Sequence, residues 1–533
     1  MKKTILLAVL LCISSVAFAD KYIIRDVEYD VKGITRPYAI ETKVLVDKKL
    51  VFKNEDELMD YINDYSQKLE NTRVFEKISV DFSLKEHSQE ETESSENTET
   101  LYDVYLKVST KDSKHLLAVP YPKYDSNNGF SLRLKAKDTN FLGSMEEMAG
   151  DFNFAIEQDN ENDDPEYKFG FNMEFATPFR LWKFNASWVN DIEVSYTLGE
   201  STPEWNLQTG LDLELPFDAF SVKFAFNQSF IRDLDYEDYD ENGTMVHYGD
   251  GTYFVENAKI SVPIILQKVR DWGNIYYTPY IEATYNWDFD GISDLYPKYK
   301  SNDGLLGPAM EIGQSISTER INWIENFRNG MSASFTESVS YNFETYTFSP
   351  GISTELKAYK AFKHFCFSTD IYAFAYLNSN VSIGKRLRGI RDEQYFDSDT
   401  GDGDKKACYT PGAVVINLDL PIRIFKVHWE DVPVIKHIPY VRYFDMELQL
   451  SPFIDIAFIK NRSTGTIFDY RDGFLAGGIE AIVYPLKWKG IQVRGSLGVD
   501  LGRKMPYIKG KLNQDWRDSV SAYEISIGIG LHY

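Results

Sequence analysis

The sequence contains little cysteine, with 3 residues in a chain of 533. Cys12 lies in the N-terminal apolar segment, so only Cys366 and Cys408 remain in the rest of the chain. Two cysteines do not make the disulfide framework of a small secreted domain. We also expect these two not to pair, because the strand pattern places them near opposite ends of long strands, too far apart for a disulfide.

Long apolar runs are also missing. After residue 19 no stretch approaches the ~20 consecutive apolar residues that a transmembrane helix needs. The 7 histidines are scattered, and the chain has no HExxH, GxSxG or P-loop pattern. We therefore expect no transmembrane helix, no enzymatic activity and no cofactor.

Positive charge is outnumbered, since 57 Lys and Arg stand against 81 Asp and Glu and the formal net charge is -24. This balance argues against a nucleic-acid-binding protein, which needs a basic face for the phosphates. The acidic segment 235–250 matches a calcium loop only in part: Asp238, Asp240, Asn242 and Gly243 fit its first half, but Gly249 stands where the bidentate Glu belongs. An acidic hairpin with an Asn-Gly turn is the favoured interpretation.

The N-terminus has the pattern of a secretory signal peptide. Lys2 and Lys3 precede an apolar run, and Ala17-Phe18-Ala19 provides a cleavage site before Asp20. The prediction is that residues 1–19 are removed on export. An exported chain without an apolar helix is either soluble or a β-barrel.

Residues 20–112 predict a small α+β domain in the order strand, helix, helix, strand, strand. Thr35 is the expected cap of the first helix, with Pro37 in its first turn. Asn54 and Glu57 have the spacing of a capping box for the second helix. The acidic stretch 86–100 between the last two strands is predicted to be a solvated loop. The order, with Gly33-Ile34-Thr35 and "TRVFEKISVDF", resembles a POTRA domain, a periplasmic module that docks polypeptides.

Residues 113–533 have a different pattern, in which segments of 10–15 residues alternate apolar and polar side chains. The last segment, "YEISIGIGLHY", shows this best, and aromatic residues make up 15% of the chain. Some connections are short and others are long and acidic, as in outer-membrane barrels. A soluble sandwich would also alternate, but the length, the export signal and the loop asymmetry favour a transmembrane antiparallel β-barrel. We count 16–18 strands.

The mature chain resembles the outer-membrane assembly-factor superfamily, the BamA/TamA or bacterial surface antigen type. The segment Gly129 to Phe152, with its Asn140-Phe141-Leu142-Gly143 step, is similar to an early barrel segment of that family. "RLRGIRD" is similar to the Val-Arg-Gly-Phe motif of the family's sixth outer loop, and here reads Leu387, Arg388, Gly389 and Ile390. Five alternating segments follow this loop, as in the family.

The resemblance implies that Arg388 folds into the lumen and pairs with an acid on a facing strand. "SPFIDIAF" offers Asp455 as that lumen partner, within a pattern where Ala457 replaces the family's Gly. An Arg fork suits a carboxylate, and Gly389 allows the loop backbone to approach closely. The alternative is that the arginines only cover a solvated loop. A second Val-Arg-Gly, at Val493–Ser496, lies inside an alternating segment and is set aside.

We also expect a weak seam between the first and last barrel strands, which would form a gate. Pro120 and Pro122 lack the N–H groups that a ladder needs, and Gly528 and Gly530 reduce side-chain packing near the terminal Tyr533. A short or bulged first strand in a tight wall is the alternative.

The function that the resemblance implies is insertion, assembly or translocation of other polypeptides at the cell outer membrane, with the N-terminal domain in the periplasm. The expected partners are the lipid bilayer, client polypeptides that bind the POTRA domain, and periplasmic or lipoprotein accessory subunits. Two alternatives stay open. One is a secretion pore or porin-like transport channel, and the other is a surface-exposed antigen or adhesin.

Overall fold

Alternation of side chains along the strands dominates both parts of the structure. The computed structural model describes residues 20–87, 100–125, 129–157, 166–200, 202–233, 237–239, 245–247, 251–269, 273–288, 308–343, 346–390, 394–395, 405–406, 408–433, 437–438, 444–461, 465–504 and 522–529. They divide into two units, one that ends at Ser113 and one that begins at Lys114. The predicted signal peptide and residues 88–99 of the predicted acidic loop lie outside the described residues, while Glu86 ends β3.

The first unit is an α+β domain with one four-stranded sheet. Its elements are β1 (Lys21–Lys32), α2 (Pro37–Lys43), β2 (Val51–Phe52), α3 (Glu55–Asn71), β3 (Phe75–Glu86) and β4 (Leu101–Asp112), and the sheet order is β2-β1-β4-β3. β1 and β4 are parallel, whereas the other neighbours are antiparallel. The sequence prediction had missed β2, since two residues are too few to show an alternating pattern.

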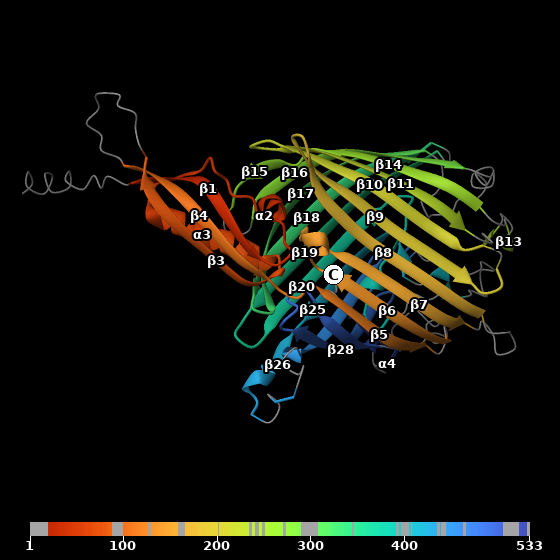
Figure 1. Ribbon diagram of the computed structural model, residues 1–533. Helices are drawn as coiled ribbons and strands as arrows, with labels where there is room; N and C mark the ends of the chain where they lie inside the picture. The colour runs from red at the N-terminus through yellow and green to blue at the C-terminus, as the bar shows by residue number, and fades with distance from the viewer. Residues whose placement is uncertain are drawn as a thin grey trace, which may run out of the picture. The chain divides into compact units, whose positions relative to one another are not determined.

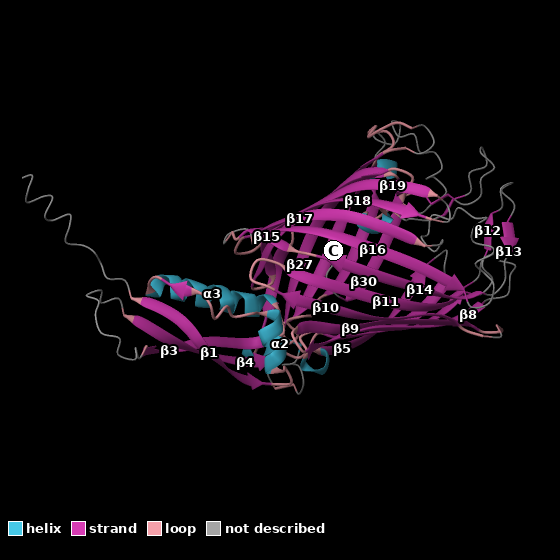
Figure 2. Cartoon of the chain, turned by 90° about the horizontal axis from the view of Figure 1, so that it is seen from above, coloured by secondary structure: helices cyan, strands magenta, loops and turns pink. Residues whose placement is uncertain are grey.

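Helix α3 covers one face of this sheet (Figure 2). The predicted cap is confirmed, because the Asn54 side chain accepts from the Glu57 amide at 2.8 Å and Glu57 accepts from the Lys53 amide at 2.8 Å. The buried side chains of α3 are Leu58, Ile62, Tyr65 and Leu69. This apolar stripe, at helical spacing, forms the core of the domain against the sheet.

The predicted cap of helix α2 is wrong. Arg36 is its N-cap and has no side-chain capping bond, although Pro37 stands in the first turn as expected. Thr35 is buried and instead donates its hydroxyl to Asp112 at 2.8 Å. The same carboxylate also accepts the amides of Ile34 and Thr35. A carboxylate that accepts two amides and a hydroxyl outcompetes a local cap, and it fixes the turn after β1 to the end of β4.

The second unit is a closed barrel of antiparallel strands (Figure 1). Its wall contains β5 (Leu116–Asp125), β6 (Gly129–Asp138), β7 (Met148–Glu157), β8 (Glu166–Leu181), β9 (Phe184–Thr197), β10 (Glu204–Pro216), β11 (Ser221–Asp233), β14 (Gly251–Ser261), β15 (Ile264–Gln267), β16 (Ile275–Asp288), β17 (Ala309–Ile324), β18 (Phe327–Asn342), β19 (Thr347–Ala361), β20 (Cys366–Tyr376), β25 (Gly412–Asp419), β26 (Ile422–Val427), β27 (Met446–Ile459), β28 (Phe474–Pro485), β29 (Val493–Asp500) and β30 (Tyr523–Ile529). The predicted barrel is confirmed.

The wall consists of eighteen strands, within the predicted range of 16–18. β14 and β15 both pair with β16 and are two parts of one interrupted strand. β25 and β26 stand in the same relation to β27. The twenty segments of the closed sheet are therefore eighteen strands among the described residues. This number is even, so that the first and last strands meet antiparallel.

Smaller elements lie outside the wall. They are β12 (Glu237–Tyr239), β13 (Met245–His247), β21 (Val381–Ser382), β22 (Gln394–Tyr395), β23 (Lys405–Lys406), β24 (Tyr409–Thr410) and α4 (Leu501–Lys504). β12 pairs antiparallel with β13, as the predicted acidic hairpin requires. Asp240, Asn242, Gly243 and Gly249 of the calcium-loop comparison lie outside the described residues.

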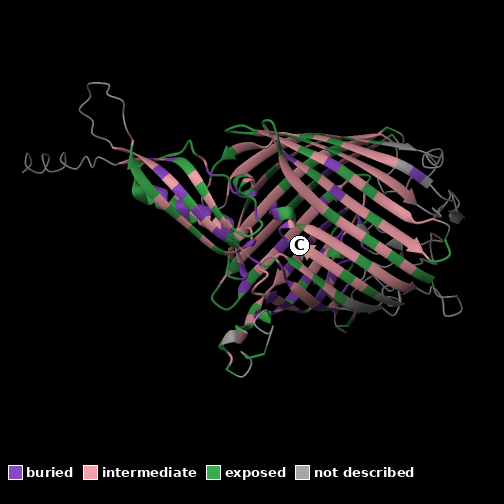
Figure 3. Ribbon diagram, in the orientation of Figure 1, coloured by how far each residue is buried: buried purple, intermediate pink, exposed green. Residues whose placement is uncertain are grey.

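Exposed and less exposed residues alternate along the barrel strands (Figure 3), and many of the exposed ones are large and apolar. Examples from strands around the wall, with the exposed fractions of the residues, are Phe226 at 49%, Ile312 at 58%, Ile454 at 45%, Leu497 at 44% and Ile525 at 70%. Exposed apolar side chains on every second residue are what a lipid-facing wall requires. No helix among the described residues is long and apolar enough to cross a membrane.

Candidate functional site

The segment 383–390 forms a compact loop after β20 and β21. A single 3-10 turn spans Gly384–Arg386, and Gly389 has φ +89. Ile383 donates its amide to the Cys408 carbonyl at 3.0 Å, and Leu387 donates to the Gly384 carbonyl at 3.0 Å. The loop is therefore a defined structure, which lets it carry side chains to fixed positions.

Apolar residues of this loop are buried against the inner face of the wall. Ile383 is 0%, Leu387 1% and Ile390 6% exposed. Their cluster also contains residues that alternate along β25, β27 and β28: Ala413, Val415, Ala457, Ile459, Phe474 and Ala476. The inner face of these strands is thus apolar or small where the loop packs, so hydrophobic burial holds the loop against the wall.

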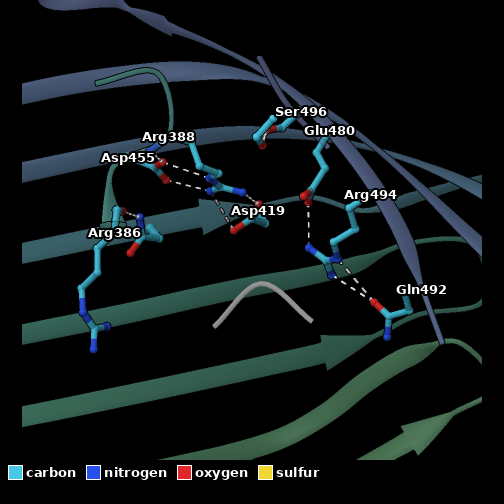
Figure 4. A network of polar contacts seen from close by, with 10 residues as sticks. Arg386, Arg388, Asp419, Asp455, Glu480, Gln492, Arg494 and Ser496 are labelled. Carbon is cyan, nitrogen blue, oxygen red and sulfur yellow. Dashed lines mark hydrogen bonds and ion pairs between the residues drawn. The ribbon is translucent and has the colours of Figure 1, made fainter. Parts of the chain in front are cut away.

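Arg388 is the centre of the polar contacts (Figure 4). Its Nε lies 3.0 Å and its Nη2 2.7 Å from the two carboxylate oxygens of Asp455, and its backbone amide donates to the same carboxylate at 2.9 Å. Arg388 is 6% and Asp455 0% exposed. The structure therefore brings together the two residues that the sequence comparison had paired, in a buried bidentate geometry.

A second acid, Asp419, completes the pairing. Nη1 of Arg388 lies 2.6 Å and Nη2 3.2 Å from the two Asp419 oxygens. The Arg388 guanidinium also lies 3.8 Å from the centre of the Phe453 ring. Sequence reasoning had missed Asp419, whereas Phe453 belongs to the same "SPFIDIAF" pattern that gave Asp455. Two carboxylates and an aromatic face surround one cation, which compensates its removal from water.

Strand register explains why these groups meet. Asn417 of β25 stands opposite Asp455 of β27, and Asp419 stands opposite Phe453. All four side chains project from the same face of two adjacent strands. Asn417 in addition donates its side-chain N–H to the Arg386 carbonyl at 2.7 Å. Every second residue of this part of the wall thus contacts the loop.

Gly389 allows the loop backbone to touch the wall backbone. A Cβ at Gly389 would lie 2.5 Å from the Val499 nitrogen, and one at Gly498 would lie 2.5 Å from the Gly389 nitrogen. The Gly389 amide donates to Glu524 of the last strand at 2.6 Å. Two glycines are needed at this crossing because each removes a side chain that would hold the two backbones apart.

Arg386 makes a separate, more accessible contact. It lies 2.9 Å from Glu355 of β19 and 3.7 Å from Asp370 of β20, and its guanidinium is 3.9 Å from the Tyr372 ring centre. Its side chain is 28% exposed, against 5% for Arg388. The two arginines therefore belong to one loop, but the guanidinium group of Arg388 is surrounded by protein, whereas that of Arg386 is still partly in contact with water. Arg391, the other arginine of the "RLRGIRD" segment, lies outside the described residues.

Further buried ion pairs lie on the inner face of the same wall. Arg494 donates to Glu480 at 2.9 Å, and Arg423 lies 3.1 Å from Glu447, whose side chain is 0% exposed. Sequence reasoning had set Arg494 aside as part of a strand, and it does lie in β29. The sequence pattern could have predicted that Arg494 faces the lumen, because Arg494 lies on the polar face of the alternating segment. Among the described residues no group of His, Cys, Asp or Glu could hold a metal ion.

Three of the five predicted gate residues lie in β5 and β30, the two strands of the seam. Pro120 and Pro122 lie in β5 opposite Leu134 and Leu132 of β6, and Gly528 lies in β30 opposite Arg494. Gly530 and Tyr533 lie outside the described residues. β30 and β5 are neighbours in the closed sheet.

The turn between β28 and β29 adds contacts to the first strand. Trp488 donates its indole N–H to the Leu116 carbonyl at 2.8 Å, and the Lys114 amide donates to the Lys487 carbonyl at 2.8 Å. Lys114 also lies over the Trp488 ring at 4.7 Å. The start of the first strand is thus fixed by a turn as well as by its sheet neighbours.

The Asn140-Phe141-Leu142-Gly143 step forms the turn after β6. Asn140 is 0% exposed, and its side-chain oxygen accepts from the Met145 amide at 2.9 Å. Gly143 has φ +73. The step thus has a local structural role as a tight, fully satisfied turn.

Comparisons with known proteins gave structural similarity only. No family model and no curated protein matches the chain. CdiB from Acinetobacter baumannii is similar over 96% of this chain and 74% of its own, with 12% identity and a TM-score of 0.47. BamA from Haemophilus ducreyi lacking POTRA domains 1-3 is similar over 96% and 84%, with 13% identity and a TM-score of 0.33. CdiB from Escherichia coli is similar over 97% and 91%, with 9% identity and a TM-score of 0.39.

Proposed function

We propose that this chain is an outer-membrane barrel protein that inserts or translocates other polypeptides. The observation that carries the proposal is the loop at 383–390, which the wall binds through Arg388, Asp455 and Asp419. A solvated surface loop would not bury a cation to 6% exposure or cross a strand at a glycine–glycine contact. The proposal involves no enzymatic step and no cofactor.

The buried pair is better evidence for placement than for stability. Transferring three ionised groups out of water is costly, and apolar side chains of similar volume would often stabilise a protein as well. An ionic arrangement instead fixes one position of the loop, since only that position satisfies all the hydrogen bonds. Fixing a loop against one part of the wall leaves the rest of the lumen free for a passing or inserting chain.

The α+β domain is proposed to be a POTRA-type domain in the periplasm that docks client polypeptides. Within the described sheet of this domain, β3 has a neighbour on one side only, namely β4. β3 spans 12 residues, so its other edge offers a row of backbone groups that an extended client could pair with. Accessory periplasmic or lipoprotein subunits would bind here or beside it.

The seam between β5 and β30 is the proposed exit toward the lipid. Ala118 of β5 and Ile527 of β30 lie in the two strands that meet at this seam. Cysteines at these positions, once crosslinked, should abolish client assembly, and reductant should restore it. Full activity of a quantitatively crosslinked protein would exclude a lateral exit.

A transport channel is the second candidate, favoured by the polar lumen face of β9 and β10. Glu193 and Asp212 lie on that face and are exposed. A porin-like channel would conduct small solutes without acting on polypeptides. A surface antigen or adhesin is the third candidate, and it is tested by whether the outer loops, transplanted to a neutral scaffold, bind a host ligand.

Depletion of the protein separates these functions. The expected result is a fall in the amounts of other outer-membrane or secreted polypeptides, measured by quantitative proteomics of membrane and secreted fractions. Re-expression of the wild type should restore them, whereas Arg388→Ala should not. An unchanged proteome with altered uptake of small solutes would support the channel instead.

A further inference from the structure

Glu337 is an acid on the outer, apolar face of the barrel. It lies in β18 between Phe335 and Val339, which share its face and are 43% and 38% exposed. On the neighbouring strands Ile352 stands directly opposite Glu337, and Ile312 stands opposite Val339. These two are 48% and 58% exposed. A carboxylate among exposed aliphatic side chains is unusual on the outer wall of a barrel, which marks this position as a candidate binding site.

A chain of hydrogen bonds orients this carboxylate. The Tyr277 hydroxyl donates to Oε1 of Gln314 at 2.5 Å, which leaves the amide nitrogen of Gln314 to donate to Oε1 of Glu337. Tyr277, Gln314 and Glu337 come from three successive strands, β16, β17 and β18. One carboxylate oxygen is thereby held toward the wall, and the charge of Glu337 stays without a cation in these contacts.

A groove of about 850 Å³ runs over the same residues. Besides Tyr277, Gln314 and Glu337, its lining includes Pro279, Ile312, Val339, Pro350 and Ile352, all on the outer face by the alternation of their strands. Gly313 and Gly351 belong to the same strands but face the lumen, where the rings of Tyr280 and Tyr376 lie against them, so the proline rings are the ones that line the outer surface. An apolar groove with one oriented polar group has the character of a ligand site rather than of a flat lipid contact.

The height of Glu337 matches the level of lipid head groups. β18 begins at Phe327, and Glu337 follows ten residues later. At about 3.3 Å per residue and a tilt of about 40°, this places Glu337 about 25 Å above the start of the strand. The apolar band of such a barrel is about 25 Å tall. Stacked aromatic pairs at the hairpins, such as Phe362–Phe365 with 4.6 Å between ring centres, mark the opposite boundary.

We propose that the groove binds an amine-bearing lipid, with its ammonium group on Glu337 and an acyl chain along Ile312 and Ile352. Charge complementarity identifies the head group, because a carboxylate attracts a cation and a primary ammonium combines the positive charge with hydrogen-bond donors. The apolar lining identifies the rest of the ligand. A quaternary ammonium has no N–H to donate and should bind less well.

The test uses the full-length protein in nanodiscs or mixed micelles that contain phosphatidylethanolamine or phosphatidylcholine. Native mass spectrometry should show retained phosphatidylethanolamine, and Glu337→Gln should reduce its apparent affinity about tenfold, as expected for one lost charge-assisted contact. Ile352→Trp, which fills the groove and keeps the acid, should reduce binding as well. Neither variant changes the loop at 383–390, so client assembly should continue.

Glu256→Gln is the matched control. Glu256 is also an acid on the outer face, and it accepts from Gln228 at 3.0 Å, but it lies outside the groove. Its substitution should leave lipid retention unchanged. Equal retention of both lipids by the wild type, or an equal loss in Glu256→Gln and Glu337→Gln, would overturn the proposal. Release of the lipid by a co-purifying protein that contacts Glu337 in crosslinking would assign the groove to a protein partner and also overturn it.

Discussion

The inner faces of two parts of the barrel wall differ, although their strands alternate in the same way. On β25 and β27 the residues that face the lumen are covered: Ala413, Val415, Asn417, Asp455 and Ala457 are 0–1% exposed. On β9 and β10 the corresponding Glu193 and Asp212 are exposed. The first wall carries small, apolar and precisely paired residues because a loop packs on it, whereas the second carries acids that water can solvate. Alternation alone therefore identifies a barrel, and the composition of the polar face identifies where the barrel is filled.

Substitution of Arg388 should have the largest effect, because it releases the loop that covers the inner face of β25 and β27. Arg388→Ala leaves Asp455 and Asp419 without their cation, and breaking a buried pair in this way costs about 3–5 kcal/mol. We expect a lower unfolding temperature, measured by the heat-modifiable shift on gels, together with loss of client assembly. Arg386→Ala is the control, because its ion pair with Glu355 is partly solvated. Equal, mild effects of both changes would support a merely solvated loop.

Exchange of the charges should recover part of that loss. In the double variant Arg388→Asp with Asp455→Arg, the central pair is restored in reverse, and close pairs are energetically coupled. Recovery should be incomplete, because Asp419 then faces a second acid instead of a cation. Unfolding temperatures of the two single variants and the double variant form the cycle. Strict additivity of the single effects would show that the two residues do not interact.

Loss of the close backbone contact at Gly389 should weaken the attachment of the loop less than loss of the Arg388 charge does. Gly389→Ala places a Cβ 2.5 Å from the Val499 nitrogen and strains a left-handed backbone, so the loop should detach and become sensitive to protease. Gly465→Ala is a matched control, since Gly465 has φ +71 but nothing within 4 Å of the added carbon. The difference in cleavage rate between the two variants isolates the contact from the backbone strain. A similar rate in both would remove the contact from the explanation.

Lumen-facing positions on β9 and β10 should be more accessible to water than those on β27. Single cysteine substitutions at these positions should reveal this without a large change in the stability of the barrel. In a Cys366→Ala, Cys408→Ala background, a cysteine at Glu193 or Asp212 should react readily with a small water-soluble maleimide. A cysteine at Ser451, which is 1% exposed, should react far more slowly. Mass spectrometry of the labelled protein gives both rates. Equal labelling rates at these positions would mean that the two parts of the wall are equally covered or equally open to water.

The sequence supported the fold better than it supported the site. Alternation and export signal predicted a barrel, and the spacing of Asn54 and Glu57 predicted the cap of α3, because both patterns are local. The pairing of Arg388 with Asp455, 67 residues apart, came only from a family resemblance. Asp419 and Glu524 could not be predicted as partners of the loop, since alternation reveals which face a residue occupies but not which distant strands stand in register. The cap of α2 failed because Asp112, 77 residues from Thr35, bound it instead.

The contact between Trp488 and Leu116 has a consequence for the order in which the barrel forms. The two residues are separated by 372 positions, so the start of the first strand cannot reach its final surroundings until nearly the whole chain has been made. Contacts of such long range slow folding, because loop-closure entropy is lost before they form. Throughout that interval the unpaired edge of β5 is open to other strands and needs protection from aggregation. Closure of the sheet between β5 and β30 should therefore come late in folding, after β29 and β30 have been added to the wall.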